Sequence, residues 1–275
     1  MTKHIYATGI YHEISNANYH ASAGISRSGM MEFKRAPIFY WHKYLNPDYK
    51  HEAPSAAMEF GTAVHAFILE PEKFAEEYFV MEKNPFHGAT KAGKIFKAEQ
   101  LELVGNKTII TQANFDILLD MAASIKENPQ TDGLITGALY EQSIYWTDKD
   151  TGLLCKARPD ILHSNFIVDL KTADDASEYK FQRSVYHFGY HVQMAMLREG
   201  VLQTTGKDIK DFIFLVIEKS APYATAIYTL DESFLDRGLN EFKLILLQMK
   251  NCFDENVWPS YPSKNICLPA YLESL

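Results

Sequence analysis

The chain has 275 residues, of which 47% are hydrophobic and 23% are charged, as in an ordinary globular protein with one large core. Its 27 basic and 35 acidic residues give a formal net charge of −8, which argues against a protein that coats DNA through phosphate neutralisation alone. The apolar runs are far shorter than the ~20 residues that cross a bilayer, and no secretion signal is visible, so we expect a cytoplasmic protein without a membrane segment.

The first part of the chain is expected to be helical. Within residues 24–45, Ser26 can cap a short helix, and Pro37 should end that helix and begin the next. Residues 56–69 form a second helical stretch that ends before Pro71, and Thr111 caps a third over residues 111–127. The glycine- and lysine-containing segment 88–94 resembles a phosphate-binding loop only in spacing, because Ile95 stands where Ser or Thr must bind magnesium. We expect a mobile basic loop there.

In the centre of the chain, apolar residues recur with the period of two that is typical of β-strands. Three β-rich runs, residues 139–146, 153–162 and 166–171, are separated by turn residues and predict a three-stranded antiparallel meander. A long helix over 176–202, strands over 211–218 and 224–230 and a final helix over 233–251 follow. This order predicts an α/β fold, a mixed central sheet flanked by helices, in one domain over residues 1–275 with an N-terminal arm over 1–24 and the core over 25–275.

The candidate chemistry lies in Arg158-Pro159-Asp160 and Asp169-Leu170-Lys171. Asp169 and Lys171 are two apart on a strand and therefore share a face, and a short turn can bring Asp160 beside Asp169. Two carboxylates suit a hard cation such as Mg²⁺, with Mn²⁺ as a substitute, and Lys171 can orient water or neutralise charge. Taken alone, an Asp-x-Lys strand more often forms a weak ion pair on a solvated surface.

Two further segments favour a metal site over a weak ion pair on the surface. His65 follows Gly61 by one helical turn, and the glycine leaves space beside an imidazole that can complete a mixed nitrogen and oxygen metal site. Tyr190 and Gln193 share a helix face, and a Gln amide can orient water or a phosphate oxygen. His187 and His191 have a spacing that could hold zinc, but no third ligand is evident. The cysteines Cys155, Cys252 and Cys267 are too few and too widely spaced for a disulfide framework or a metal site.

The chain resembles RecE-type exonucleases (exodeoxyribonuclease VIII) within the PD-(D/E)xK superfamily, related to RecB-like and phage recombination exonucleases. The resemblance covers nearly the whole chain from Ile25, and six weak motifs in order carry it: Gly61-Thr62-Ala63-Val64-His65, Leu69-Glu70-Pro71-Glu72, Ser143-Ile144-Tyr145-Trp146, Arg158-Pro159-Asp160, Asp169-Leu170-Lys171-Thr172 and Tyr190-His191-Val192-Gln193. Trp258-Pro259 extends the match.

This resemblance implies a phage or prophage exonuclease that digests one strand of linear duplex DNA from its 5′ end. The product would be a 3′ overhang for recombination by strand annealing. It implies metal binding by His65, Asp160, Asp169 and the backbone carbonyl of Leu170, with Lys171 catalytic beside Gln193 and Tyr190. It also implies a ring-shaped homo-oligomer and a partner that anneals single strands. Two alternatives remain, an endonuclease on the same fold and a non-catalytic protein that binds DNA ends.

Overall fold

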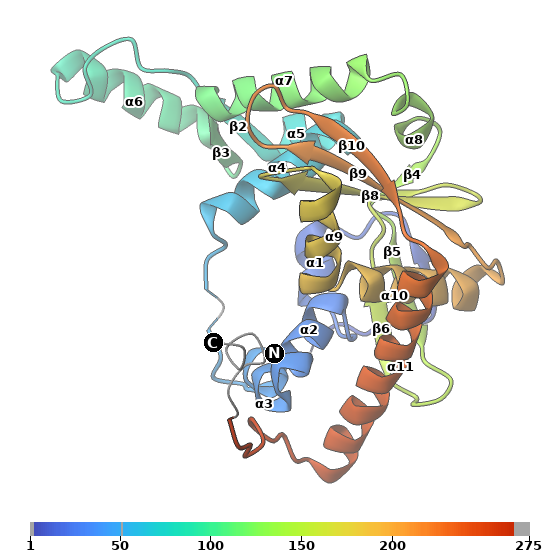
Figure 1. Cartoon of the computed structure of the whole chain (residues 1–275). Helices are drawn as coiled ribbons and strands as arrows, with labels where there is room; N and C mark the ends of the chain where they lie inside the picture. The colour runs from blue at the N-terminus through green and yellow to red at the C-terminus, as the bar shows by residue number, and fades with distance from the viewer. Residues whose placement is uncertain (1–2, 51, 267–275) are drawn as a thin grey trace, which may run out of the picture.

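The computed structural model describes residues 3–50 and 52–266. Its central element is a five-stranded mixed sheet in the order β10-β9-β8-β7-β4 (Figure 1). The strands are β4 (Leu139–Tyr140), β7 (Ile161–Leu162), β8 (Phe166–Ala173), β9 (Asp211–Glu218) and β10 (Thr225–Thr229). Only β8 and β9 run parallel, and the connection between them carries two helices, α9 (Glu178–His187) and α10 (Tyr190–Thr205). The mixed α/β fold predicted from the sequence is confirmed.

Two smaller sheets accompany the central one. Strands β1 (Gly9–Tyr11), β5 (Ser143–Thr147) and β6 (Leu154–Ala157) form an antiparallel sheet, while β2 (Tyr78–Met81) and β3 (Thr108–Thr111) pair in parallel. The predicted meander is therefore wrong in one respect. The run 153–162 is two strands, β6 and β7, which belong to different sheets because the chain turns at Arg158-Pro159-Asp160. Proline donates no ladder hydrogen bond, which suits it to such a break.

The remaining elements are helices. The N-terminal group is α1 (Asn16–Ala21), α2 (Arg27–Arg35), α3 (Pro37–Tyr40) and the π-helix η1 (Trp41–Leu45). The others are α4 (Ala56–Leu69), α5 (Pro71–Glu77), α6 (Lys91–Val104), α7 (Gln112–Glu127), α8 (Asp132–Ile135) and α11 (Glu232–Glu255). Ser26 and Thr111 accept backbone N–H groups at the starts of α2 and α7, as their cap positions predict. Among the described residues, none of the helices has both the length and the apolar character needed to cross a bilayer.

Two sequence predictions about helices are wrong. The stretch 176–202 is two helices, since Gly189 has φ +68° and ends the first of them. Residues 91–94 of the segment 88–94, expected to be a mobile loop, are the first turn of helix α6, and Thr90 caps this helix because its side chain accepts the N–H of Gly93. Of the cysteines, Cys155 is buried, Cys252 is half-buried and both are free, whereas Cys267 lies outside the described residues.

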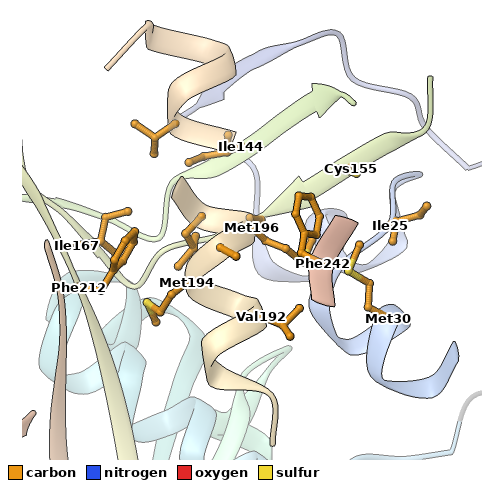
Figure 2. Close-up of a cluster of buried hydrophobic side chains, with 14 of the residues drawn as sticks. Ile25, Met30, Ile144, Cys155, Ile167, Val192, Met194, Met196, Phe212 and Phe242 are labelled. Carbon is orange, nitrogen blue, oxygen red and sulfur yellow. The ribbon is translucent and has the colours of Figure 1, made fainter. Parts of the chain in front are cut away.

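The central sheet separates two apolar cores. Side chains that alternate along β8 and β9 serve both: Ile167 and Phe214 face one core, while Val168, Leu170 and Leu215 face the other. The first core contains α2, α10 and α11 together with the small antiparallel sheet (Figure 2). The second contains α4, α5 and α7. The end of β7 and the middle of β8 are thus fixed from both sides.

Candidate active site

Asp160 is placed by the turn that separates the two sheets. Its side-chain Oδ2 accepts the backbone N–H of Leu170 at 2.7 Å, which holds the carboxylate against the middle of β8. Ile161 of β7 pairs with Val168 of β8, and this register fixes the distance between the two segments. Asp160 is buried, and the predicted approach of this carboxylate to the Asp169-Leu170-Lys171 strand is confirmed.

His65 reaches the same carboxylate from helix α4. Its Nδ1 lies 3.6 Å from Oδ2 of Asp160, and its side chain is 25% exposed. The adjacent residues Ala63, Val64 and Leu69 pack into the second core, which orients the helix. A Cβ added at Gly61 would meet nothing within 4 Å, so this glycine leaves open space one turn before the imidazole.

Glu141 is a third member that sequence reasoning did not find. Its Oε1 lies 3.8 Å from Nδ1 of His65, and its Oε2 pairs with Nε of Arg158 at 2.9 Å. Glu141 was predicted within a strand over 139–146, where one acidic residue carries no signal. The structure instead breaks that run between β4 and β5, and Glu141 has φ +51° there. Such a conformation is costly for a residue with a side chain and is concentrated at functional sites.

The ligand atoms of His65, Glu141 and Asp160 all lie within 4.8 Å of one another. Burial and the neighbouring Asp169 raise the pKa of Asp160 to about 7. Burial would lower the pKa of His65, but Asp160 and Glu141 outweigh it and raise that pKa to about 9. The pKa of Glu141 is lowered, because His65 and Arg158 outweigh its burial. Protonated His65 thus supplies the positive charge between the Asp160 and Glu141 carboxylates, where a cation would otherwise supply it.

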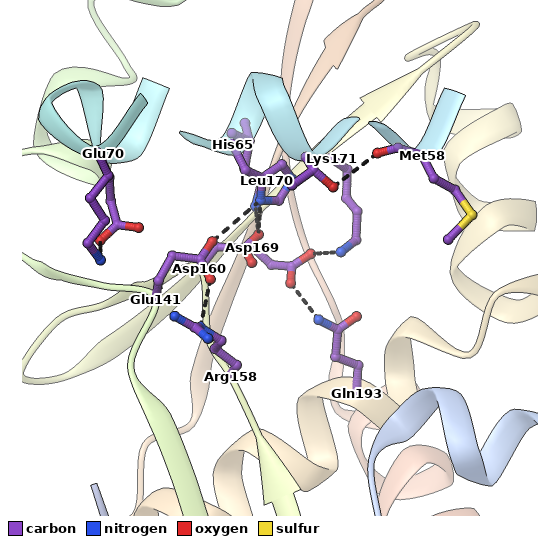
Figure 3. A network of polar contacts seen from close by, with 12 residues as sticks. Met58, His65, Glu70, Glu141, Arg158, Asp160, Asp169, Leu170, Lys171 and Gln193 are labelled. Carbon is purple, nitrogen blue, oxygen red and sulfur yellow. Dashed lines mark hydrogen bonds and ion pairs between the residues drawn. The ribbon is translucent and has the colours of Figure 1, made fainter. Parts of the chain in front are cut away.

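Asp169 forms a second cluster beside the first. Its carboxylate pairs with Lys171 and accepts a hydrogen bond from Nε2 of Gln193 at 2.6 Å (Figure 3). The Lys171 ammonium also lies 4.7 Å from the ring centroid of Tyr190. Arg27 at the start of α2 donates to Oε1 of Gln193 at 3.4 Å. The structure thus brings the predicted residues Asp169, Lys171, Tyr190 and Gln193 together.

The fit of a divalent cation can be judged from the donor set. One imidazole nitrogen and two carboxylates from separate segments converge, and Asp169 adds charge that raises the pKa of Asp160. Such a cluster is unfavourable without a cation and suits Mg²⁺ or Mn²⁺. Leu170, predicted to contribute its carbonyl, holds Asp160 through its N–H. His191, whose spacing from His187 could suit zinc but for which the sequence offers no third ligand, is buried, and its Nδ1 lies 3.2 Å from the carbonyl oxygen of Val185.

The first cluster and Gln193 of the second line one large cleft of about 1160 Å³. His65, Glu141, Asp160 and Gln193 lie along it, and it continues past α1 and the start of α2. Its cationic residues include Arg27, Lys73 and Arg158. The cleft is therefore large enough for a polymeric substrate and carries charges of both signs.

The family model described as a PDDEXK-like domain of unknown function (DUF3799) matches residues 26–268. The chain belongs to this family. No curated protein matches it. The chain is similar to the solved structure of a putative exonuclease from Eubacterium rectale, with 19% identity and a TM-score of 0.59 over 92% of this chain and 96% of that one. A phage-related exonuclease from Haemophilus somnus is more distant, with 13% identity and a TM-score of 0.34 over 61% of this chain and 85% of that one. The PD-(D/E)xK-type fold predicted from the sequence is confirmed.

Proposed function

We propose that this DUF3799 protein is a metal-dependent exodeoxyribonuclease of the RecE type, acting on linear duplex DNA in the cytoplasm. The observation that carries the proposal is the convergence of His65, Glu141 and Asp160 in a large cleft that is also lined by Gln193, which donates to Asp169, the partner of Lys171. The similarity to a putative exonuclease supports it. On this proposal residues 1–275 act as one nuclease domain.

The proposed roles follow from the contacts. His65, Glu141 and Asp160, with Asp169 and the carbonyl of Leu170 as further candidates, would hold Mg²⁺ or Mn²⁺. The cation would supply Lewis-acid stabilisation of charge on a phosphoryl group. Lys171 is positioned by Asp169 and Tyr190 so that its ammonium can donate to a phosphate oxygen. Gln193, held by Asp169 and Arg27, would orient the phosphate or the attacking water.

Polarity and biological role are the finer parts of the proposal. The resemblance to RecE-type enzymes supports digestion from the 5′ end, a 3′ overhang, a phage or prophage setting, and a homo-oligomeric ring working with a single-strand annealing protein. An endonuclease on the same fold and a protein that only binds DNA ends are the alternatives that the experiment must separate.

The test uses the wild-type protein on four substrates: linear duplex, the same duplex with both 5′ ends protected, the same duplex with both 3′ ends protected, and covalently closed circles. We expect digestion of linear DNA in Mg²⁺ or Mn²⁺, its loss in EDTA, and resistance of circles. Ca²⁺ is expected to bind without supporting turnover. Cleavage of circles would indicate an endonuclease, and binding of ends without any metal-dependent cleavage would indicate a non-catalytic protein.

A further inference from the structure

A second surface lies on helix α9, outside the cleft. It is a hollow of about 810 Å³ lined by residues of α9, the α9–α10 junction and α11. Three of the nine lining residues are basic and none is acidic, although the whole chain carries a net charge of −8. The basic residues are Lys180, Arg183 and Arg237. We call this surface the α9 patch.

Aromatic rings are interleaved with these charges. Tyr179 is 62% exposed, Tyr186 50% and Phe188 49%, which is unusual for three large rings so close together in the chain. The guanidinium of Arg183 lies 5.7 Å from the ring centroid of Tyr179, and that of Arg237 lies 5.1 Å from that of Tyr186. Each of these arginines also donates to the hydroxyl of its tyrosine.

The two arginines are free to meet an anion. Within residues 3–50 and 52–266, neither Arg183 nor Arg237 forms an ion pair with a carboxylate. The nearby Glu241 is already neutralised, because Lys34 pairs with it at 2.6 Å. The hydroxyl contacts hold the guanidinium groups in place without cancelling their charge.

A line of rings connects the α9 patch with the candidate active site. The ring centroid of Phe188 lies 5.7 Å from that of Tyr190, and the Lys171 ammonium lies 4.7 Å from Tyr190. His187 is adjacent to Phe188, with ring centroids 4.8 Å apart. Phe188 thus links the exposed rings of the patch to Tyr190, the ring that lies next to Lys171.

We propose that the α9 patch binds single-stranded DNA next to the active site, with bases stacked on Tyr186 and Phe188 and phosphates at Arg183 and Arg237. This inference rests on the proposed nuclease function for its substrate class. Exposed aromatic faces combined with cations bind single strands without sequence preference, because every base has a π-face. A helix of this length spans about 15 Å, so the patch can contact a short stretch of a single strand.

The experiment measures the fluorescence anisotropy of a labelled oligo-dT in EDTA, at several salt concentrations. The double variant Arg183→Ala/Arg237→Ala should weaken binding at least about tenfold. The slope of log K against log salt should fall by about 1.4, because each single-strand phosphate contact contributes about 0.7. The charge-matched double variant Lys126→Ala/Lys149→Ala, on exposed positions elsewhere, should keep the wild-type affinity and slope.

Stacking is tested separately from charge. Tyr186→Ala/Phe188→Ala should lose affinity on the order of tenfold, whereas Tyr186→Phe should retain it because the ring remains. Hydrolysis of bis(p-nitrophenyl) phosphate, which is too small to reach the patch, should be unchanged in every patch variant. Unfolding midpoints within a few degrees of wild type would show that the variants fold.

Three results would overturn the proposal. The first is wild-type affinity for oligo-dT in both the arginine and the aromatic double variants. The second is a wild-type protein that binds duplex DNA more tightly than oligo-dT and loses affinity for both equally in these variants, and the third is dissociation of an oligomer in the variants while their affinity for DNA stays unchanged. The last result would make the patch an interface between copies. The outcomes separate the two proposals. Wild-type protein that binds oligo-dT through the patch but cleaves nothing removes the nuclease function alone, and active enzyme with unaffected patch variants removes the patch alone.

Discussion

Nδ1 of His65 lies 3.6 Å from Oδ2 of Asp160, although the two residues come from helix α4 and from the turn before β7. No local pattern joins those segments, so their meeting is a property of the fold. The same pair supplies the most direct test of the candidate metal site.

Replacement of His65 by alanine should weaken Mg²⁺ binding and DNA cleavage by at least about tenfold. Even residues that only hydrogen-bond to a metal ligand typically cost about tenfold or more in metal affinity or activity when they are mutated. The fold should persist, because the side chain is 25% exposed. Titration calorimetry with Mg²⁺ and Mn²⁺ measures the affinity. His42→Ala on the exposed side of η1 is the control. If His65→Ala lowers only the unfolding temperature, His65 is a core residue and not a ligand.

Glu141→Gln should lower metal affinity about tenfold while leaving stability close to wild type. The amide keeps the size of the side chain and can still accept from Arg158, but it removes one negative charge from the cluster. Calorimetry and thermal unfolding on the same sample separate these effects. A loss of stability with unchanged metal affinity would mean that Glu141 serves only to neutralise Arg158.

Lys171→Met should abolish cleavage and leave Mg²⁺ binding in place, since the ammonium contacts Asp169 and Tyr190 and is not among the cation's candidate ligands. Removing one partner of a buried ion pair also lowers the free energy of unfolding, by up to about 3–5 kcal/mol. Single-turnover cleavage at saturating Mg²⁺ is the measurement. Wild-type turnover in the variant would refute the catalytic role of this lysine.

Lys156 predicts a pH dependence of stability that is independent of the active site. Its ammonium donates to the carbonyls of Tyr19 and Ser22, and burial, with a smaller effect of Lys3, lowers its pKa from 10.5 to about 8. Below pH 8 the lysine is protonated in both states and the penalty of burying its charge is complete. Between pH 8 and 10.5 the folded state releases the proton first, so the unfolded state binds more protons and stability rises with pH.

The measurement compares urea unfolding of wild type and Lys156→Met from pH 7 to 10.5. The wild type should gain stability relative to the variant as pH rises through this window. Lys149→Met, at an exposed position, should give a difference that does not change with pH. Parallel curves for Lys156→Met would show that burial does not lower the pKa of this lysine.

Two helical glycines should respond in opposite directions to alanine. A Cβ at Gly238 would lie 2.2 Å from the carbonyl oxygen of His191, so Gly238→Ala should force α10 and α11 apart and cost about 1–3 kcal/mol. A Cβ at Gly61 meets open space, so Gly61→Ala should raise the free energy of unfolding by about 0.5–1 kcal/mol. Chemical denaturation measures both, and equal effects of the two substitutions would contradict the described packing.

The parts of the fold that could be predicted are those with local causes. Ser26 and Thr111 mark helix starts through their hydroxyls, and the period-two pattern of β8 placed Asp169 and Lys171 on one face. The division of residues 153–162 between two sheets could not be predicted, because both halves are apolar and the break depends on long-range pairing. Glu141 was missed for the same reason, since its position depends on a left-handed turn that only the surrounding sheets impose.

The position of the site between two separate apolar cores has a further consequence for folding. His65 is anchored in the core of α4 and α7, whereas Gln193 lies on α10 between residues of the other core, and Asp160 sits in the turn that joins the sheets. A cation that binds only the assembled cluster therefore stabilises the arrangement of both cores together, in proportion to the logarithm of its concentration. The bound metal would couple the unfolding of the two cores, and its removal would make their unfolding less cooperative.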